Sequence, residues 1–175
     1  MKCRELCSAE TIAQHVARLG KEISRQYAGE QLHVVLLLNG AVIFGADLVR
    51  ALDPELDVVL DTVAAASYTG SESSGEIQFR TELKNDPAGK HILIVDDILD
   101  TGCTMNRLMR FFREKGAASV RSCVLLDKIL DDPAKKLCQC DWAGFRIPNL
   151  FVVGYGLDYN EWGRHFPFIG CMEEE

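Results

Sequence analysis

The sequence predicts an α/β domain in which helices flank a central, mostly parallel sheet. Short apolar runs alternate along the chain with segments of helical periodicity, as they do in β–α–β units. The runs at 33–38 and 91–95 are almost continuously apolar, which is typical of strands buried on both faces. A length of 175 residues fits one domain spanning residues 1–175.

The first helix is expected to begin after Ser8, whose hydroxyl can cap it. Its apolar residues then recur at helical spacing on one face, at Ile12, Val16, Leu19 and Ile23. This periodicity predicts an amphipathic helix packed against the sheet.

The remaining elements follow in alternation. Asn39-Gly40 breaks the strand at 33–38, and a helix is expected over 41–52, before the turn at Pro54. Further strands are expected at 56–66, 76–83, 91–95, 120–126 and 151–154, with a helix at 104–115.

The charge balance narrows the class of ligand. Lys and Arg total 19 against 26 Asp and Glu, a formal net charge of −7. This balance disfavours nonspecific nucleic-acid binding, which depends on positive charge. Seven cysteines in no zinc-binding pattern are expected to be reduced thiols. With no apolar run of membrane-spanning length, a cytoplasmic location is expected.

Two adjacent carboxylates, Asp96 and Asp97, follow the apolar run at 91–95, and Asp100 comes shortly after. Because charges resist leaving water, such a cluster usually persists where a metal, a polyol or a proton transfer uses it. The pair can accept hydrogen bonds from two ribose hydroxyls or lie beside Mg²⁺. From these residues alone, a solvated loop, a helix cap and a receiver domain phosphorylated on one acid remain open.

A short polar loop continues from the acids through Thr101, Gly102, Cys103 and Thr104. Successive backbone N–H groups and two hydroxyls at a helix start can hold a phosphate. Simple capping of the helix by Asp100 or Thr101 is the alternative. The loop matches neither the triphosphate-binding nor the dinucleotide-binding glycine motif.

The acids and the loop together resemble the ribose-phosphate signature of the type I phosphoribosyltransferase family. Residues 35–48 resemble the first strand, pyrophosphate loop and helix of its purine branch. The Ser/Gly-rich stretch at 67–76 resembles that branch's mobile lid, and 125–128 resembles its base-recognising lysine segment. Residues 151–161 resemble its purine pocket, and Arg164 follows at the expected distance.

This resemblance implies the family's fold, with a small hood formed by chain-terminal segments. It implies a purine-salvage enzyme that transfers 5-phosphoribosyl from phosphoribosyl diphosphate to N9 of hypoxanthine or guanine, giving IMP or GMP and pyrophosphate. It also implies Mg²⁺ as cofactor, a homodimer or homotetramer, and no nucleic-acid or membrane partner. A nucleotide-sensing, RNA-binding regulator on the same fold is the rival interpretation, which would need a basic face.

The resemblance also assigns roles to particular residues, with Asp100 as the general base that takes the proton from purine N7. The phosphoribosyl group would be bound by Asp96, Asp97, Asp100, Thr101, Gly102, Cys103 and Thr104. Pyrophosphate would be bound by Asn39, Gly40, Ser67, Tyr68 and Arg164. The purine would be bound by Lys128, Phe151, Val152 and Asp158, and the metal by Asp158, with Asp96 and Asp97 acting through the ribose.

One departure from the family pattern concerns the pyrophosphate loop, where Asn39 stands in place of a frequent basic residue. Binding of the diphosphate is therefore expected to depend more on Mg²⁺ and Arg164. A cis peptide is also expected within Leu38-Asn39-Gly40, by resemblance to the relatives.

Overall fold

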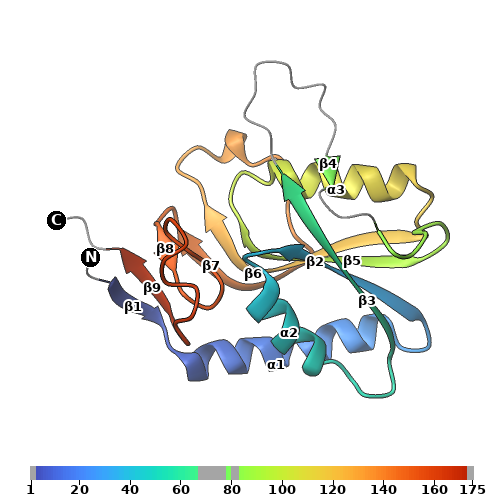
Figure 1. Cartoon of the computed structure of the whole chain (residues 1–175), viewed down its shortest axis with the longest axis horizontal. Helices are drawn as coiled ribbons and strands as arrows, with labels where there is room; N and C mark the ends of the chain where they lie inside the picture. Colours follow the sequence, from blue (N-terminus) through green and yellow to red (C-terminus); the bar gives the residue numbers. More distant parts are fainter. Residues whose placement is uncertain (1–2, 67–77, 80–82, 173–175) are drawn as a thin grey trace.

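Helices cover both faces of a central sheet, and a smaller sheet lies at one end (Figure 1). The computed structural model describes residues 3–66, 78–79 and 83–172. The larger sheet has the strand order β4-β3-β2-β5-β6-β7, and the smaller sheet has the order β1-β9-β8. Helices α1 and α2 lie on one face of the larger sheet and α3 lies on the other.

The larger sheet consists of β2 (Gln31–Leu38), β3 (Asp57–Ala66), β4 (Gln78–Phe79), β5 (His91–Leu99), β6 (Ser119–Ile129) and β7 (Trp142–Pro148). The smaller sheet, the hood, consists of β1 (Cys3–Cys7), β8 (Val152–Val153) and β9 (Ile169–Met172). The helices are α1 (Ala9–Gln26), α2 (Val42–Arg50), α3 (Cys103–Glu114) and the short 3-10 helix η1 (Pro133–Lys135).

The central strand β5 is buried on both faces, as its apolar run predicts. It pairs in parallel with β2 on one side and with β6 on the other. Leu93 and Val95 pack in the cluster that contains α1 and α2, whereas Ile92 and Ile94 pack in the cluster beneath α3. Because β2, β5 and β6 are parallel, their carboxyl ends meet at one edge of the sheet, where ligands of such sheets bind.

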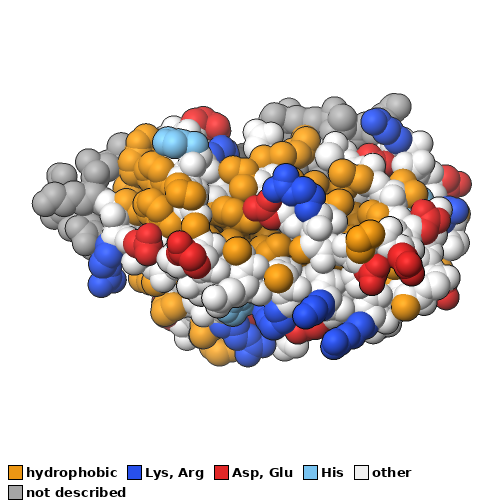
Figure 2. All heavy atoms as spheres, turned by 90° about the horizontal axis from the view of Figure 1, so that it is seen from below, with side chains coloured by type: hydrophobic (Ala, Val, Ile, Leu, Met, Phe, Trp, Pro, Cys, Tyr) orange, Lys and Arg blue, Asp and Glu red, His pale blue; other side chains and the backbone are white. Residues whose placement is uncertain are grey.

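Helix α1 has the predicted cap and the predicted apolar face. The Ser8 hydroxyl accepts a hydrogen bond from Thr11 N at 3.2 Å. Figure 2 looks onto the face that carries α1 and shows charged side chains scattered among apolar ones. All four residues of the predicted apolar face are buried: Ile12, Val16, Leu19 and Ile23.

The acid pair does not follow the end of its strand, which corrects the prediction. Strand β5 continues to Leu99, since Asp96 pairs with Val124 and Ile98 pairs with Leu126 of β6. Pairing with β6 therefore places both acids within β5 and fixes their backbone. The sequence pattern failed here because charged residues usually mark the end of a buried run.

Strands β1, β7 and β9 were not expected individually. Strand β1 is largely exposed and forms by pairing with β9, Cys3 opposite Met172, a contact that local sequence cannot reveal. The resulting hood of chain-terminal segments confirms the fold that the resemblance implies. Of the strand expected at 76–83, the structure describes Gln78–Phe79 as strand, and the expected lid with Ser67 and Tyr68 lies outside the described residues.

The contact between α1 and α2 generates a stability prediction at Gly20. A Cβ built there would lie 2.3 Å from the carbonyl oxygen of Ala51, a backbone atom. Gly20→Ala is therefore expected to lower the free energy of unfolding by about 1–3 kcal/mol through overpacking. Helix propensity alone would favour Ala by about 1 kcal/mol, so the sign of the change distinguishes the two effects.

Urea unfolding followed by circular dichroism measures this change. Ala13→Gly, on the exposed face of the same helix, serves as the control and should cost about 1 kcal/mol through propensity alone. A Gly20→Ala protein as stable as the parent would contradict the close approach of the two helices.

Candidate active site

The two adjacent carboxylates of β5 are half-buried and oriented by backbone amides. Asp97 N donates to Asp96 Oδ1 at 3.0 Å, and Ile98 N donates to Asp97 Oδ1 at 2.9 Å. Each carboxylate thus has one oxygen fixed by a backbone amide. This arrangement suits the recognition of neighbouring hydroxyl groups.

Burial raises the pKa of both carboxyl groups. The pKa of Asp96 lies well above its usual value because of desolvation first and the charge of Asp97 second. Desolvation also raises the pKa of Asp97, although hydrogen bonds and the nearby Arg164 guanidinium partly offset it. The pair is therefore an unfavourable arrangement in the protein alone, which is typical of a functional site.

The phosphate-type loop lies directly beside this pair. Gly102 is the N-cap of α3, with φ of 80°, so no side chain at that position can cap the helix. Cys103 N makes a long 3.4 Å hydrogen bond to the Thr101 hydroxyl. The N-cap residue therefore makes no side-chain capping bond, Thr101 contributes only this long one, and the helix start remains suited to an anion.

A cavity of about 110 Å³ follows the same stretch of chain, which is room for a small polyatomic anion. Its lining includes every residue expected to bind the sugar phosphate except Asp97. The full lining is Asp96, Ile98, Leu99, Asp100, Thr101, Gly102, Cys103, Thr104 and Met105.

Asp100 and Lys128 lie together at the edge of this cavity. The Lys128 ammonium Nζ is 3.2 Å from Asp100 Oδ2. Asp100 directly follows β5, and Lys128 lies near the end of the neighbouring strand β6. The ammonium side chain is 12% exposed and the carboxylate side chain is 53% exposed. The carboxylate is therefore open to a ligand while the ammonium is held beneath it.

The loop after β2 approaches the acid pair at Gly40. A Cβ at Gly40 would lie 1.9 Å from Asp97 Oδ2, and one at Gly156 would lie 2.2 Å from the Gly40 carbonyl oxygen. Only glycine fits at these two positions, which bring the loop, β5 and the hood into contact. The Leu38–Asn39 peptide is cis, as expected from the resemblance.

Arg164 joins the hood to the same region. Its guanidinium is 2.9 Å from Asp158 Oδ1 and donates to the carbonyl oxygen of Gly156 at 2.8 Å. Asp158 Oδ2 accepts a hydrogen bond from Glu161 N at 2.8 Å. The residues expected to bind metal and pyrophosphate, Asp158 and Arg164, are thus paired with each other.

The two remaining expected purine contacts lie in or beside β8 of the hood. Val152 is buried, whereas Phe151 is 53% exposed although it is a large apolar residue. The Phe151 ring meets the Tyr159 ring edge-to-face, with centroids 5.4 Å apart. An exposed aromatic face of this kind is available for stacking against a flat ligand.

Sequence reasoning missed three side chains around the site. Lys136 Nζ donates to the carbonyl oxygens of Leu99 and Lys128, and Cys138 Sγ donates to the carbonyl oxygen of Gly102. The Tyr155 hydroxyl donates to Asp47, a contact that connects the hood to α2. Burial raises the pKa of Tyr155, and this hydrogen bond raises it further. All three are long-range contacts without a local sequence signal.

The raised pKa of Asp96 predicts that Asp96→Asn stabilises the ligand-free protein. The folded chain binds its proton more tightly than the unfolded chain, so stability of the parent falls as pH rises above 3.8 toward the raised value. The gain in stability from the Asp96→Asn substitution should be absent below pH 3.8, grow as pH rises from 3.8 toward the raised pKa and persist at neutral pH.

A gain of about 1 kcal/mol would raise Tm by about 2–4 °C in a chain of this size. Differential scanning calorimetry from pH 3.5 to 8 measures it. Asp131→Asn, an exposed site with the same change in net charge, is the control. Equal Tm values for the parent and the Asp96→Asn protein at neutral pH would contradict the burial of this charge.

Comparison with known proteins identifies the family of this site. Residues 4–160 match the sequence model of the family described as phosphoribosyl transferase domain. The chain is 39% identical over 173 residues to a hypoxanthine-guanine phosphoribosyltransferase of Streptococcus pneumoniae, covering 97% of this chain and 93% of that protein. It is 41% identical over 175 residues to the Aquifex aeolicus protein of the same name, covering 99% and 96%.

A solved structure agrees with these sequence matches. The hypoxanthine phosphoribosyltransferase of Trypanosoma cruzi, in complex with the product IMP, superposes with a TM-score of 0.87 at 32% identity, covering 97% of this chain and 94% of that chain. Fold and sequence agree over nearly the whole length. The chain therefore belongs to the phosphoribosyltransferase family.

Proposed function

We propose that this protein is a purine-salvage enzyme that transfers a 5-phosphoribosyl group from phosphoribosyl diphosphate to N9 of hypoxanthine or guanine. The products are IMP or GMP and pyrophosphate. The observation that carries the proposal is the cavity at 96–105, where a helix start suited to phosphate adjoins two carboxylates suited to ribose hydroxyls. The names of the pneumococcal, Aquifex and Trypanosoma relatives support the choice of a 6-oxopurine.

The sugar phosphate is positioned from both ends. Backbone N–H groups at 101–104 and the hydroxyls of Thr101 and Thr104 hold the 5′-phosphate, and Asp96 and Asp97 accept hydrogen bonds from the ribose hydroxyls. These contacts leave the anomeric carbon facing the base. Positioning of this kind can lower a barrier by several kcal/mol.

Asp100 and Lys128 contact one edge of the purine. N7 and O6 lie side by side on a 6-oxopurine, and the two protein groups lie 3.2 Å apart. Asp100 accepts the proton from N7 as N9 attacks, and Lys128 donates to O6. Adenine carries an amino group at that position, which cannot accept this hydrogen bond, so Lys128 selects 6-oxopurines.

The hood supplies the remaining contacts. Phe151 stacks on the base, and the backbone of Val152 meets its edge. Arg164, with Asn39 and Gly40 in the loop after β2, binds the diphosphate. Ser67 and Tyr68 belong to the same proposed pyrophosphate site as part of a lid, and they lie outside the described residues.

The acids available fit Mg²⁺, which takes oxygen ligands and is often held by one or two carboxylates together with substrate phosphates. Asp158 would bind it directly, and Asp96 and Asp97 would act through the ribose. No three acidic, histidine or cysteine side chains group into a metal site within residues 3–66, 78–79 and 83–172. The ion, when bound, would offset negative charge on the leaving diphosphate.

We further infer a homodimer or homotetramer and a cytoplasmic location from the family resemblance. No helix in the described part of the chain is long and apolar enough to cross a membrane.

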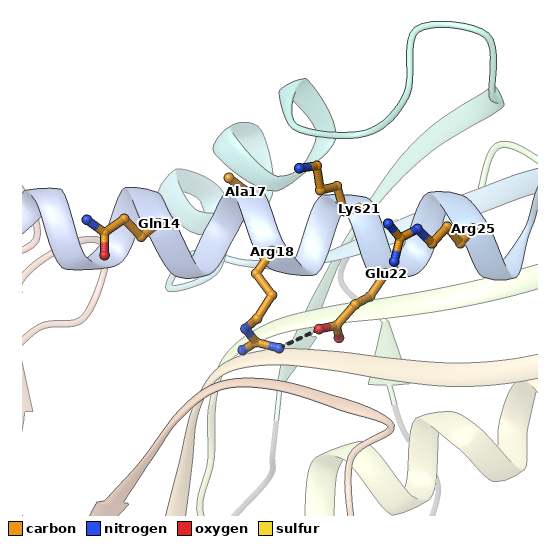
Figure 3. Close-up of a pocket in the computed structure, with 6 residues that line it drawn as sticks. All are labelled: Gln14, Ala17, Arg18, Lys21, Glu22 and Arg25. Carbon is orange, nitrogen blue, oxygen red and sulfur yellow. Dashed lines mark hydrogen bonds and ion pairs between the residues drawn. The ribbon is translucent and has the colours of Figure 1, made fainter.

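The rival RNA-binding function gains no support from the cationic residues of α1. Figure 3 shows Arg18, Lys21 and Arg25 along this helix, with Arg18 and Glu22 pointing toward each other. Arg18 pairs with Glu22 at 3.0 Å and also donates to the carbonyl oxygen of Ala143 at 2.9 Å. The helix face is therefore mixed in charge, whereas nonspecific RNA binding needs a basic face.

A direct assay tests the proposed function. Purified protein, phosphoribosyl diphosphate and Mg²⁺ are mixed with hypoxanthine, guanine, xanthine or adenine in turn, and pyrophosphate release is followed. Release with hypoxanthine or guanine and none with adenine is the expected result. Absence of release with every base would refute the proposal.

Asp100→Asn is expected to reduce kcat by about 100-fold or more, because the amide cannot accept the N7 proton. Steady-state kinetics with hypoxanthine measures the loss. Asp131→Asn, an exposed acid outside the site, should retain the parent kcat. Full turnover by the Asp100→Asn protein would remove this residue from the mechanism.

Lys128→Ala is expected to lower kcat/KM for hypoxanthine by about 10- to 100-fold, the value of one charged hydrogen bond. Preference for hypoxanthine over adenine should weaken by a similar factor. Parallel assays with both bases measure the ratio, and an unchanged ratio would show that Lys128 does not read O6.

A further inference from the structure

Lys136 is a half-buried cation that none of the proposed roles uses. It follows η1 in the connection between β6 and β7, and its side chain is 17% exposed. Its ammonium has three donors, and three acceptors meet it: Asp127 Oδ1 at 2.7 Å, the Lys128 carbonyl oxygen at 2.8 Å and the Leu99 carbonyl oxygen at 3.0 Å.

The two carbonyl acceptors lie at the proposed catalytic pair, one just before Asp100 and the other in Lys128. The Leu99 carbonyl is part of the peptide bond to Asp100, and the other carbonyl is that of Lys128 itself. One ammonium therefore bridges the end of β5 and the end of β6 at the point where Asp100 and Lys128 face each other across 3.2 Å.

Two further contacts hold the Lys136 segment in place. Leu137 N donates to the carbonyl oxygen of Thr101 at 2.8 Å, and Cys138 Sγ donates to that of Gly102. The segment thus lies alongside the phosphate-type loop. The charge on Lys136 is balanced by Asp127, whose carboxylate is also 3.6 Å from the Arg146 guanidinium. A flexible surface lysine would not have these fixed partners.

We propose that Lys136 is a positioning residue that sets the separation between Asp100 and Lys128, and through it the discrimination among 6-substituted purines. This inference rests on the proposed function, because it concerns the same two groups. Lys136 acts through the backbone of its neighbours and needs no contact with substrate. Its loss should therefore change the chemical step and base selection more than the binding of phosphoribosyl diphosphate.

The test compares Lys136→Met with Lys135→Met, a neighbouring lysine that is exposed. In Lys136→Met, kcat for hypoxanthine should fall by about 10- to 100-fold, as misplacement of reacting groups does. KM for phosphoribosyl diphosphate should stay within about threefold, since the phosphate loop keeps its own contacts. Lys135→Met should match the parent in both constants.

Selection among bases separates positioning from a loss of folded enzyme. The ratio of kcat/KM for hypoxanthine over 6-mercaptopurine, whose sulfur is a weaker acceptor, should fall toward one in Lys136→Met. A smaller active fraction would lower both rates equally and leave the ratio unchanged. Lys136→Arg, which keeps the charge, should recover part of the parent ratio. An unchanged kcat and ratio in Lys136→Met would overturn the inference.

Two further measurements complete the test. If Lys136→Met does not fold, Asp127→Asn removes the charged acceptor instead, and the same fall in the ratio is expected. A crystal structure of either variant should show the Lys128 Nζ to Asp100 Oδ2 distance longer than 3.2 Å. An unchanged distance would overturn the inference even in a protein without transferase activity, whereas inactivity of the parent alone would refute only the proposed function.

Discussion

The structure depends on holding two carboxylates inside a paired strand. Asp96 and Asp97 sit in β5 between buried apolar residues and the helix start at Cys103, and β6 pairs with the strand alongside them. Desolvation raises the pKa of both, so the arrangement costs folding free energy. The parallel strands on either side supply apolar burial that offsets this cost.

Around these acids, three cations in the described part of the chain each have an acidic partner. Lys128 pairs with Asp100, Lys136 with Asp127, and Arg164 with Asp158. Such pairing offsets the charge of these three cations before an anion arrives. A bound diphosphate would therefore compete with Asp158 for Arg164, and the backbone N–H groups at the start of α3 become correspondingly important for the 5′-phosphate.

Much of the fold, and the placement of the acids beside the loop, could be predicted from local sequence. The apolar run at 91–95, the Ser8 cap and the acid-loop motif specify elements whose residues lie close together in the chain. The edge strand β1 and the contacts of Tyr155 with Asp47 and of Lys136 with Leu99 could not be predicted, because each joins residues far apart in the chain. Position 102 is an intermediate case: the sequence predicts a loop at this glycine, but only the structure shows that it is the N-cap residue of α3 with φ of 80°.

In the proposed enzyme, the difference between the two ends of the site follows from what each would recognise. The proposed phosphate end uses backbone N–H groups together with the hydroxyls of Thr101 and Thr104, so a residue such as Cys103 is compatible with it. The base end depends on side chains, Asp100 and Lys128, which are long or exposed and have several rotamers. Such groups need external support to keep a fixed separation, and the ammonium of Lys136, between the carbonyl oxygens of Leu99 and Lys128, is placed to give it.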